Sequence, residues 1–242
     1  MQKSNIEYLT HSWNFYTGCR NQENGVCVLP CWAKGLAHRF RRSFEPTFHP
    51  LKLLDPYSHS SANEYRRRIG ICFTGDLFGD WVNPDMQFNF PPGEDSHSTL
   101  CQAVFETIKY LEHDDQFLFL TKCPWNLKKW GTFPDNAWAG ASGCNTSMMF
   151  RAVDGLQYTK AKNKWLSIEP LLEQIKPIPD FASFGINWVV IGGQTQPTML
   201  PQKEWIDEIV AAADKAGIPV WLKNNLKPLM GVNLRQEYPL GL

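Results

Sequence analysis

The sequence lacks a membrane-spanning segment, a secretory signal and the excess positive charge of many proteins that bind polyanions. Its 242 residues contain no run of eighteen or more apolar residues, so we expect no membrane-spanning helix and no membrane partner. The first residues, MQKSNIEYLTHSWN, lack the apolar core of a secretory signal, and we therefore expect an intracellular, cytoplasmic protein. The 24 basic and 24 acidic residues cancel, so net charge gives no argument for a polyanionic partner.

The chain also lacks the cysteine pattern of a disulfide-stabilised protein. Its seven cysteines are odd in number and the chain is long, so metal binding or free buried thiols are preferred. Cys72 and Cys101 lie in apolar patterns and are expected in the core. Cys123 and Cys144 follow strand ends near the presumed site, where each is either a small filler or the carrier of a substrate radical. The other three cysteines gather near the N-terminus and are the place to look for chemistry.

Short apolar runs alternate with helical patterns along most of the chain. Continuous runs of this kind suit strands that are buried on both faces of a parallel sheet. Six runs are predicted strands, and 6–13 is a weaker candidate for the first strand. The six are Ile69–Thr74, Gln116–Thr121, Asn136–Ala141, Lys164–Ile168, Trp188–Ile191 and Ile218–Leu222.

Three amphipathic helices are predicted between these strands, over 33–40, 100–111 and 205–213, with Gly217 as a C-terminal cap. Repeated strand–helix alternation predicts an α/β fold, either an open wound sheet or a barrel. We favour a partial TIM-type (β/α) barrel, formed by a single domain over 1–242. Two long loops, at 43–63 and 83–96, are expected to cover or shape a site.

Polar residues follow the predicted strands, which is why the barrel is favoured. In parallel α/β folds the ligand site lies at the carboxyl edge of the sheet. Helix capping explains one such set, but six in register indicate a ligand site. The sets are Thr74-Gly75-Asp76, Thr121-Lys122, Ser142-Gly143, Ser167-Ile168-Glu169, Gly192-Gly193-Gln194 and Lys223-Asn224.

The N-terminal cysteine cluster has the spacing of a metal-binding loop. Seven residues separate Cys19 from Cys27, and three separate Cys27 from Cys31. An iron–sulfur cluster held by three cysteines leaves one iron open to a small molecule. A structural zinc site needs a fourth ligand, for which His38 is the candidate, and unligated thiols are the third alternative.

The residues around the cluster resemble a phage-associated family of short radical-SAM-like proteins. The resemblance begins with HSWNFYTGC at 11–19 and runs in the family's order over nearly the whole chain. Its further blocks are GDLFGDWV at 75–82, FLFLTKCPWNL at 117–127, NAWAGAS at 136–142, WLSIEPLL at 165–172, WVVIGGQ at 188–194 and PVWLKNN at 219–225.

The resemblance implies a partial TIM-type barrel that carries a [4Fe–4S] cluster on Cys19, Cys27 and Cys31. The fourth iron would bind the amino and carboxylate groups of S-adenosylmethionine. Reductive cleavage would then release methionine and a 5′-deoxyadenosyl radical, which would take a hydrogen atom from the substrate. The electron would come from an external donor of flavodoxin or ferredoxin type. The commonest spacing in radical-SAM proteins is three residues and then two, so the wider loop here is a departure.

Roles for residues at the strand ends also follow from the resemblance. Gly75 and Asp76 would bind the methionine amino group, a charge-assisted contact for a carboxylate. Lys122 would balance the methionine carboxylate or a substrate anion. Ser142 and Ser167 would also bind the cofactor, and Gly192 and Gly193 would let the backbone approach its adenine or methionine closely. Glu169 would orient ribose hydroxyls or bind substrate.

Ordinary structural roles compete with these assignments. A mutual ion pair between Lys122 and Glu169 is the alternative to their catalytic roles, and Lys223 is expected to be a solvated surface charge. Two basic clusters lie at 39–42 and 66–68, and aromatic residues that include Tyr65 lie near them in the sequence. These clusters are either solvated or form one surface that binds a nucleotide or nucleic acid.

Three classes of protein remain for the whole chain. The leading hypothesis is a radical-SAM enzyme acting on an unidentified substrate, for which a nucleotide or a nucleic-acid base is the candidate. The first rival is a non-catalytic zinc- or iron–sulfur-containing protein that binds nucleic acid, and the second is an electron-transfer iron–sulfur protein.

Overall fold

A computed structural model describes residues 1–27, 29–58, 66–90, 97–111 and 114–242, and it has a mixed α/β architecture. Its centre is an eight-stranded sheet in the order β1-β2-β5-β8-β9-β10-β11-β14. β1 runs antiparallel to β2, and all other neighbours are parallel. The strands are β1 (Gln2–Lys3), β2 (His11–Trp13), β5 (Arg68–Ile71), β8 (Gln116–Phe119), β9 (Ala137–Ser142), β10 (Asn163–Ile168), β11 (Trp188–Ile191) and β14 (Val220–Leu222).

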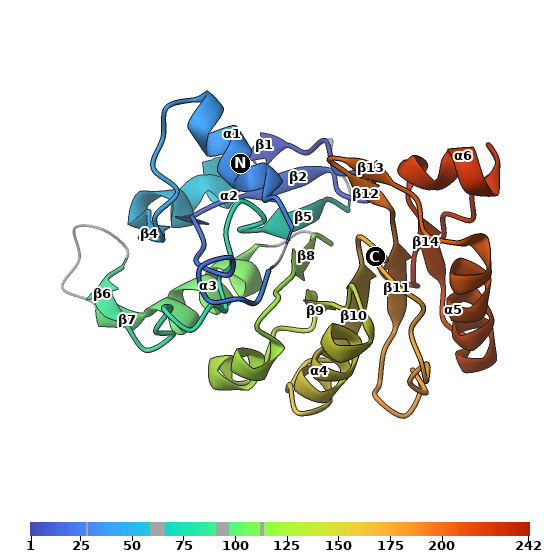
Figure 1. Cartoon of the computed structure of the whole chain (residues 1–242). Helices are drawn as coiled ribbons and strands as arrows, with labels where there is room; N and C mark the ends of the chain where they lie inside the picture. Colours follow the sequence, from blue (N-terminus) through green and yellow to red (C-terminus); the bar gives the residue numbers. More distant parts are fainter. Residues whose placement is uncertain (28, 59–65, 91–96, 112–113) are drawn as a thin grey trace.

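The longer helices lie on one side of this sheet. α3 (Leu100–Tyr110), α4 (Thr146–Gln157) and α5 (Lys203–Ala216) follow one another in chain order along the outside of the arc of strands (Figure 1). The parallel strands also follow chain order across the sheet. The sheet does not close within the described ranges, because its end strands β1 and β14 do not pair with each other.

The predicted strands are confirmed. β11 has the predicted bounds, and the other five predicted strands overlap β5, β8, β9, β10 and β14. The weaker candidate over 6–13 contains β2, which is shorter. These strands are almost entirely buried, as the continuous apolar runs indicate.

The three predicted helices are confirmed as α1 (Trp32–Arg39), α3 and α5. Gly217 ends α5 with φ 68°, the left-handed conformation that favours glycine at this position. Thr99 begins α3 with a capping box that it forms with Gln102. α4 is a further helix, and Asn145 caps it by accepting a hydrogen bond from the N–H of Met148.

Short elements fill the two long predicted loops. The loop at 43–63 contains β4 (Thr47–Phe48), a 3-10 helix (Pro50–Leu54) and α2 (Asp55–Ser58), while 59–63 lie outside the described residues. The loop at 83–96 contains β6 (Gln87–Asn89), which pairs with β7 (His97–Thr99), and 91–96 lie outside the described residues.

Other short elements complete the described chain. They are β3 (Tyr16–Thr17), β12 (Gln194–Thr195), β13 (Thr198–Met199), α6 (Lys227–Met230) and 3-10 helices at Pro124–Trp130 and Asn224–Leu226. Within the ranges given above, the helices are too short or too polar to cross a bilayer.

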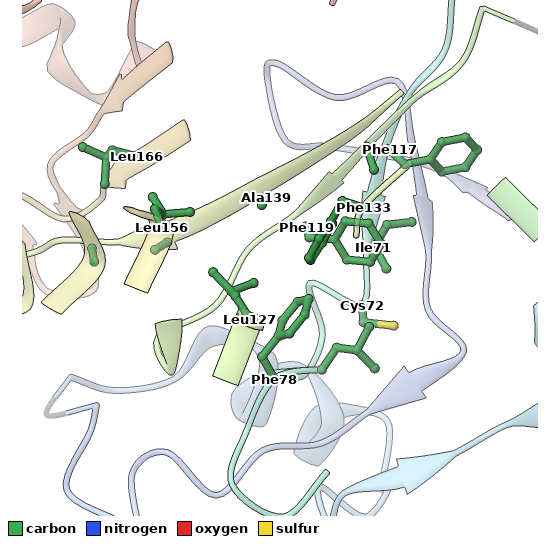
Figure 2. Close-up of a cluster of buried hydrophobic side chains, with 14 of the residues drawn as sticks. Ile71, Cys72, Phe78, Phe117, Phe119, Leu127, Phe133, Ala139, Leu156 and Leu166 are labelled. Carbon is green, nitrogen blue, oxygen red and sulfur yellow. The ribbon is translucent and has the colours of Figure 1, made fainter. Parts of the chain in front are cut away.

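The main hydrophobic core lies between the sheet and its outer helices. Alternate residues of β5, β8, β9 and β10 point into it, as Ile71, Phe119, Ala139 and Leu166 show in Figure 2. Leu156 of α4 packs against the same cluster. This arrangement leaves the other set of alternate strand residues on the opposite face, which we call the inner face.

Candidate functional site

Aromatic side chains cover the inner face of the sheet. Trp138, Trp165, Trp188 and Trp221 come from four neighbouring strands and form one cluster with Tyr8. The ring centroids of Trp165 and Trp188 lie 5.5 Å apart, and Tyr8 meets Trp188 edge-on at the same distance. The clustered rings therefore form a packed floor on this face.

A polar layer follows the aromatic floor toward the carboxyl edge of the sheet. Successive residues of a strand point to opposite faces, so residues two and four positions after an inward-facing ring also face inward. Ser167 and Glu169 stand in this relation to Trp165. By the same alternation, Ser142 follows Trp138 and Lys223 follows Trp221 on this face. Lys122 lies beyond the end of β8 and interacts electrostatically with Glu169. We call these five residues the polar layer.

Glu169 forms its ion pair with Lys223, whose Nζ lies against Glu169 Oε1. The alternative of an ion pair between Lys122 and Glu169 is therefore wrong, and so is the interpretation of Lys223 as a solvated surface charge. The two paired side chains are only 25% and 15% exposed. The pair joins the ends of β10 and β14 across the strand β11 that lies between them.

The two glycines at the end of β11 serve the packing of the protein itself. A Cβ on Gly192 would lie 3.1 Å from both Glu169 Cγ and Lys223 Cδ, so glycine leaves room for the ion pair. Gly193 donates its N–H to Asn225 Oδ1 at 3.1 Å, and its carbonyl accepts from Asn225 Nδ2 at 2.7 Å. Sequence reasoning did not single out Asn225, which occupies both backbone groups of Gly193.

Of the two lysine ammonium groups in the polar layer, that of Lys122 has no hydrogen-bond partner in the described part of the chain, while that of Lys223 is paired with Glu169. Burial favours its neutral form, but surrounding acidic groups outweigh burial and raise the pKa of Lys122. In decreasing order of effect, these groups are the thiols of Cys144 and Cys27 and the carboxyls of Asp76 and Glu169. Lys122 therefore stays charged, and the cysteine loop and the strand ends both surround it.

The cysteine loop is attached to the carboxyl edge through two glycines. Gly18 forms a bridge with Gly75, which follows β5. A Cβ on Gly75 would lie 2.6 Å from the carbonyl oxygen of Gly18. Gly18 has φ 81°, and a Cβ there would lie 2.3 Å from the carbonyl oxygen of Glu45. Both positions therefore require glycine for the loop to lie against the strand end.

Asp76 is buried and accepts four hydrogen bonds from the protein. Its carboxylate accepts hydrogen bonds from two side chains, Asn21 Nδ2 and Thr121 Oγ1, each at 2.7 Å. It also accepts hydrogen bonds from the backbone N–H groups of Lys122 at 3.0 Å and Phe78 at 3.1 Å. Burial raises the pKa of Asp76, and these hydrogen bonds oppose the rise. Asp76 thus joins the cysteine loop to the ends of β5 and β8.

Asn21 organises the wide gap between the first two cysteines. Its backbone N–H points to Cys19 Sγ at 3.4 Å, and its carbonyl accepts the N–H of Cys27 at 2.9 Å. Its side chain donates to Asp76 and accepts from Cys123 Sγ at 3.2 Å. One buried residue therefore holds both cysteines and fixes them to the sheet, although sequence reasoning did not identify it.

The three loop cysteines are free thiols that influence one another electrostatically. The pKa of Cys19 is raised to about 12, chiefly by burial, while the N–H of Asn21 acts to lower it. Asp76, Cys31 and Cys27 also contribute to this rise, in that order. Cys19 is therefore protonated at neutral pH, and a bound metal centre would displace its proton.

The three loop thiols are not arranged as the ligands of a single metal ion. Among the described residues, no group of three or more His, Cys, Asp or Glu side chains could hold a single metal ion as placed. His38, the candidate fourth ligand for zinc, is exposed on α1. Zinc holds its thiolates at about 2.3 Å, around one point. In a [4Fe–4S] cluster each thiolate binds a different iron, so the ligands need not converge in this way.

The remaining cysteines lie in two places. Cys123 and Cys144 are buried beside the site, and Cys144 Sγ donates to the carbonyl of Glu169 at 3.3 Å. Cys72 is buried in the main core, as predicted. Cys101 is half-buried against that core and also contributes to packing.

The two basic clusters do not form one surface. Arg67 is buried in a two-pronged ion pair with Asp115, and Arg68 donates to the carbonyl of Tyr8 and stacks on Tyr238. These arginines precede or begin β5, at the edge opposite the site. The cluster at 39–42 is exposed, and Tyr65 lies outside the described residues.

The fold and the site define a class of protein: an α/β chain with helices along one face of a parallel sheet and a three-cysteine loop at its carboxyl edge. The chain belongs to the family described as "Protein of unknown function (DUF5131)", which matches residues 3–227. No curated protein and no solved structure matches the chain.

Proposed function

We propose that the protein is a radical S-adenosylmethionine enzyme whose sheet is a partial (β/α) barrel of TIM type. The observation that carries the proposal is the position of the cysteine loop. Three free cysteines lie on a loop that two glycines attach to the carboxyl edge of the parallel sheet, beside an inward-facing polar layer. This edge is where parallel α/β folds bind their ligands and cofactors.

The chemistry of the three cysteines fits a [4Fe–4S] cluster with one open iron. Cys19, Cys27 and Cys31 supply thiol ligands from one loop, and none forms a disulfide. When bound, such a cluster would supply the electron for reductive cleavage of S-adenosylmethionine, which is the source of a radical able to take a hydrogen atom from a substrate.

The polar layer would hold the ligands of this reaction. The Lys122 ammonium is charged and has no hydrogen-bond partner among the described residues, so it suits the carboxylate of the cofactor or a phosphate of the substrate. The hydroxyls of Ser142 and Ser167 lie on the same face and offer donors and acceptors. A nucleotide, or a base within a nucleic acid, is our proposal for the substrate, because the Lys122 ammonium can pair with a phosphate of the nucleotide or of the nucleic-acid backbone.

Other residues would position the reacting groups instead of contacting them. Asp76 already accepts four hydrogen bonds, which supports a role in anchoring the loop. Gly192 packs against the Glu169–Lys223 pair, and the backbone of Gly193 is hydrogen-bonded to Asn225. The ion pair of Glu169 with Lys223 joins the ends of β10 and β14 beside the site.

Production of 5′-deoxyadenosine tests the proposal. Protein reconstituted anaerobically with iron and sulfide is incubated with S-adenosylmethionine and dithionite, and products are measured by mass spectrometry. We expect 5′-deoxyadenosine and methionine from the wild-type protein. A protein that assembles a cluster yet leaves S-adenosylmethionine intact would instead be an electron-transfer or structural iron–sulfur protein.

Two cysteine variants provide the matched comparison. Cys27→Ala removes a proposed ligand and is expected to lose cluster iron and product, because two cysteines remain for three irons. Cys101→Ala removes a thiol that packs against the main core and should keep both. Equal iron in the two variants would contradict the ligand assignment. Stoichiometric zinc without iron or sulfide would favour the zinc-containing binding protein.

A further inference from the structure

One face of α1 exposes apolar side chains to solvent. Trp32, Leu36 and Phe40 follow one another at intervals of four residues and are 55%, 38% and 61% exposed. Ala33 is the buried residue of this helix. An amphipathic helix normally turns its apolar stripe toward the core, and the sequence pattern predicts that arrangement here. In the structure the stripe faces outward, which marks an interaction surface.

The charged residues on and just after this helix have one sign. All charged residues from Trp32 to Phe44 are basic, namely Lys34, Arg39, Arg41 and Arg42. The Arg42 guanidinium lies 5.8 Å from the centroid of the Phe40 ring. An apolar centre with a charged rim is the anatomy of a protein interface, and tryptophan and arginine contribute most energy there. The rim selects a partner with an acidic surface.

The stripe adjoins the cysteine loop. α1 begins at Trp32, and Cys31 is its N-cap residue. Cys27 and Cys31 are themselves half-buried, so the loop reaches the surface beside this helix. Complexes that transfer electrons bury small interfaces, below about 1,200 Å² in total. The exposed face of an eight-residue helix suits an interface of that kind.

We propose that this face of α1 docks an acidic electron-donor protein of flavodoxin or ferredoxin type. The proposal rests on the proposed function, because the donor is oxidised by one electron while [4Fe–4S]²⁺ is reduced to [4Fe–4S]⁺. A nucleic acid fits the surface less well. It requires an extended basic track, and Arg67 and Arg68 of the second basic cluster are engaged within the protein at the opposite edge.

Stopped-flow reduction of the reconstituted protein tests this docking surface. Reduced flavodoxin is the probe, and bleaching of the cluster absorbance gives the second-order rate constant. The variant Arg39→Glu/Arg42→Glu replaces two rim charges, and Leu36→Glu/Phe40→Glu disrupts the apolar centre. Both are expected to slow reduction by flavodoxin at least tenfold at low salt, and added salt should slow the wild type. Two controls test whether each variant keeps an intact cluster: the iron content and the reduction of the cluster by dithionite.

Matched variants on other helices provide the control. Arg151→Glu on α4 and Tyr110→Glu on α3 change exposed residues of the same types and should stay within twofold of the wild type. Unchanged flavodoxin rates in both α1 variants, with a dithionite-reducible cluster, would overturn the docking surface alone. Loss of binding to fluorescent single-stranded DNA, with unchanged flavodoxin rates, would assign the face to nucleic acid. A wild type that forms no cluster would overturn the proposed function and this inference together.

Discussion

At the scale of single residues, the site depends on contacts between distant parts of the chain. The cysteines and the polar strand ends could be predicted because their residue types and spacing are local properties of the sequence. The role of Asn21 could not, because its partners Asp76 and Cys123 lie 55 and 102 residues away. The pairing of Glu169 with Lys223 across 54 residues likewise depends on strand order.

Replacement of Asn21 by Ala should weaken the attachment of the cysteine loop. The change removes the hydrogen bonds to Asp76 and Cys123 and leaves the backbone contacts in place, at a cost of about 1–3 kcal/mol. We expect the reconstituted cluster to lose iron to a chelator about tenfold faster, since about 1.4 kcal/mol corresponds to a factor of ten.

Asn24→Ala is the matched control on the same loop, because Asn24 is exposed. Its rate of iron release should equal that of the wild type. Equal rates in all three proteins would show that the Asn21 side chain does not hold the loop.

At the scale of elements, apolar periodicity carried most of the information. Continuous apolar runs predicted the strands well because both faces of those strands are buried. The sequence prediction omitted α4, although Met149, Val153 and Leu156 are spaced as on one helix face. Gly155 interrupts that pattern with a poor helix former, and the reason for it lies in packing. A Cβ at Gly155 would lie 2.6 Å from the backbone carbon of Pro124.

Gly155→Ala should therefore destabilise the protein despite the higher helix propensity of alanine. Overpacking against Pro124 costs about 1–3 kcal/mol. Gly35→Ala in α1 is the matched comparison, because nothing lies within 4 Å of its Cβ position. That substitution should stabilise the helix by about 0.5–1 kcal/mol. Chemical unfolding of both variants measures the difference, and a stabilised Gly155→Ala protein would contradict the close packing of α4.

At the scale of the whole molecule, strand order and helix placement give the protein two different edges. The carboxyl edge gathers the cysteine loop, Lys122 and the Glu169–Lys223 pair. At the other edge, Arg67 and Asp115 form a buried ion pair. The sequence predicted parallel strands and the edge that carries the polar residues. It did not predict that tryptophans would cover the inner face. In strands that are apolar on both faces, the residue pattern does not indicate which face the helices will cover.

The proposed function requires that the three loop cysteines hold a cluster with an iron open to S-adenosylmethionine. The most direct test is the EPR spectrum of anaerobically reconstituted, dithionite-reduced protein, recorded with and without S-adenosylmethionine. We predict a [4Fe–4S]⁺ signal whose shape changes when S-adenosylmethionine is added. A cluster signal that S-adenosylmethionine leaves unchanged, or no signal after full reconstitution, would contradict the claim.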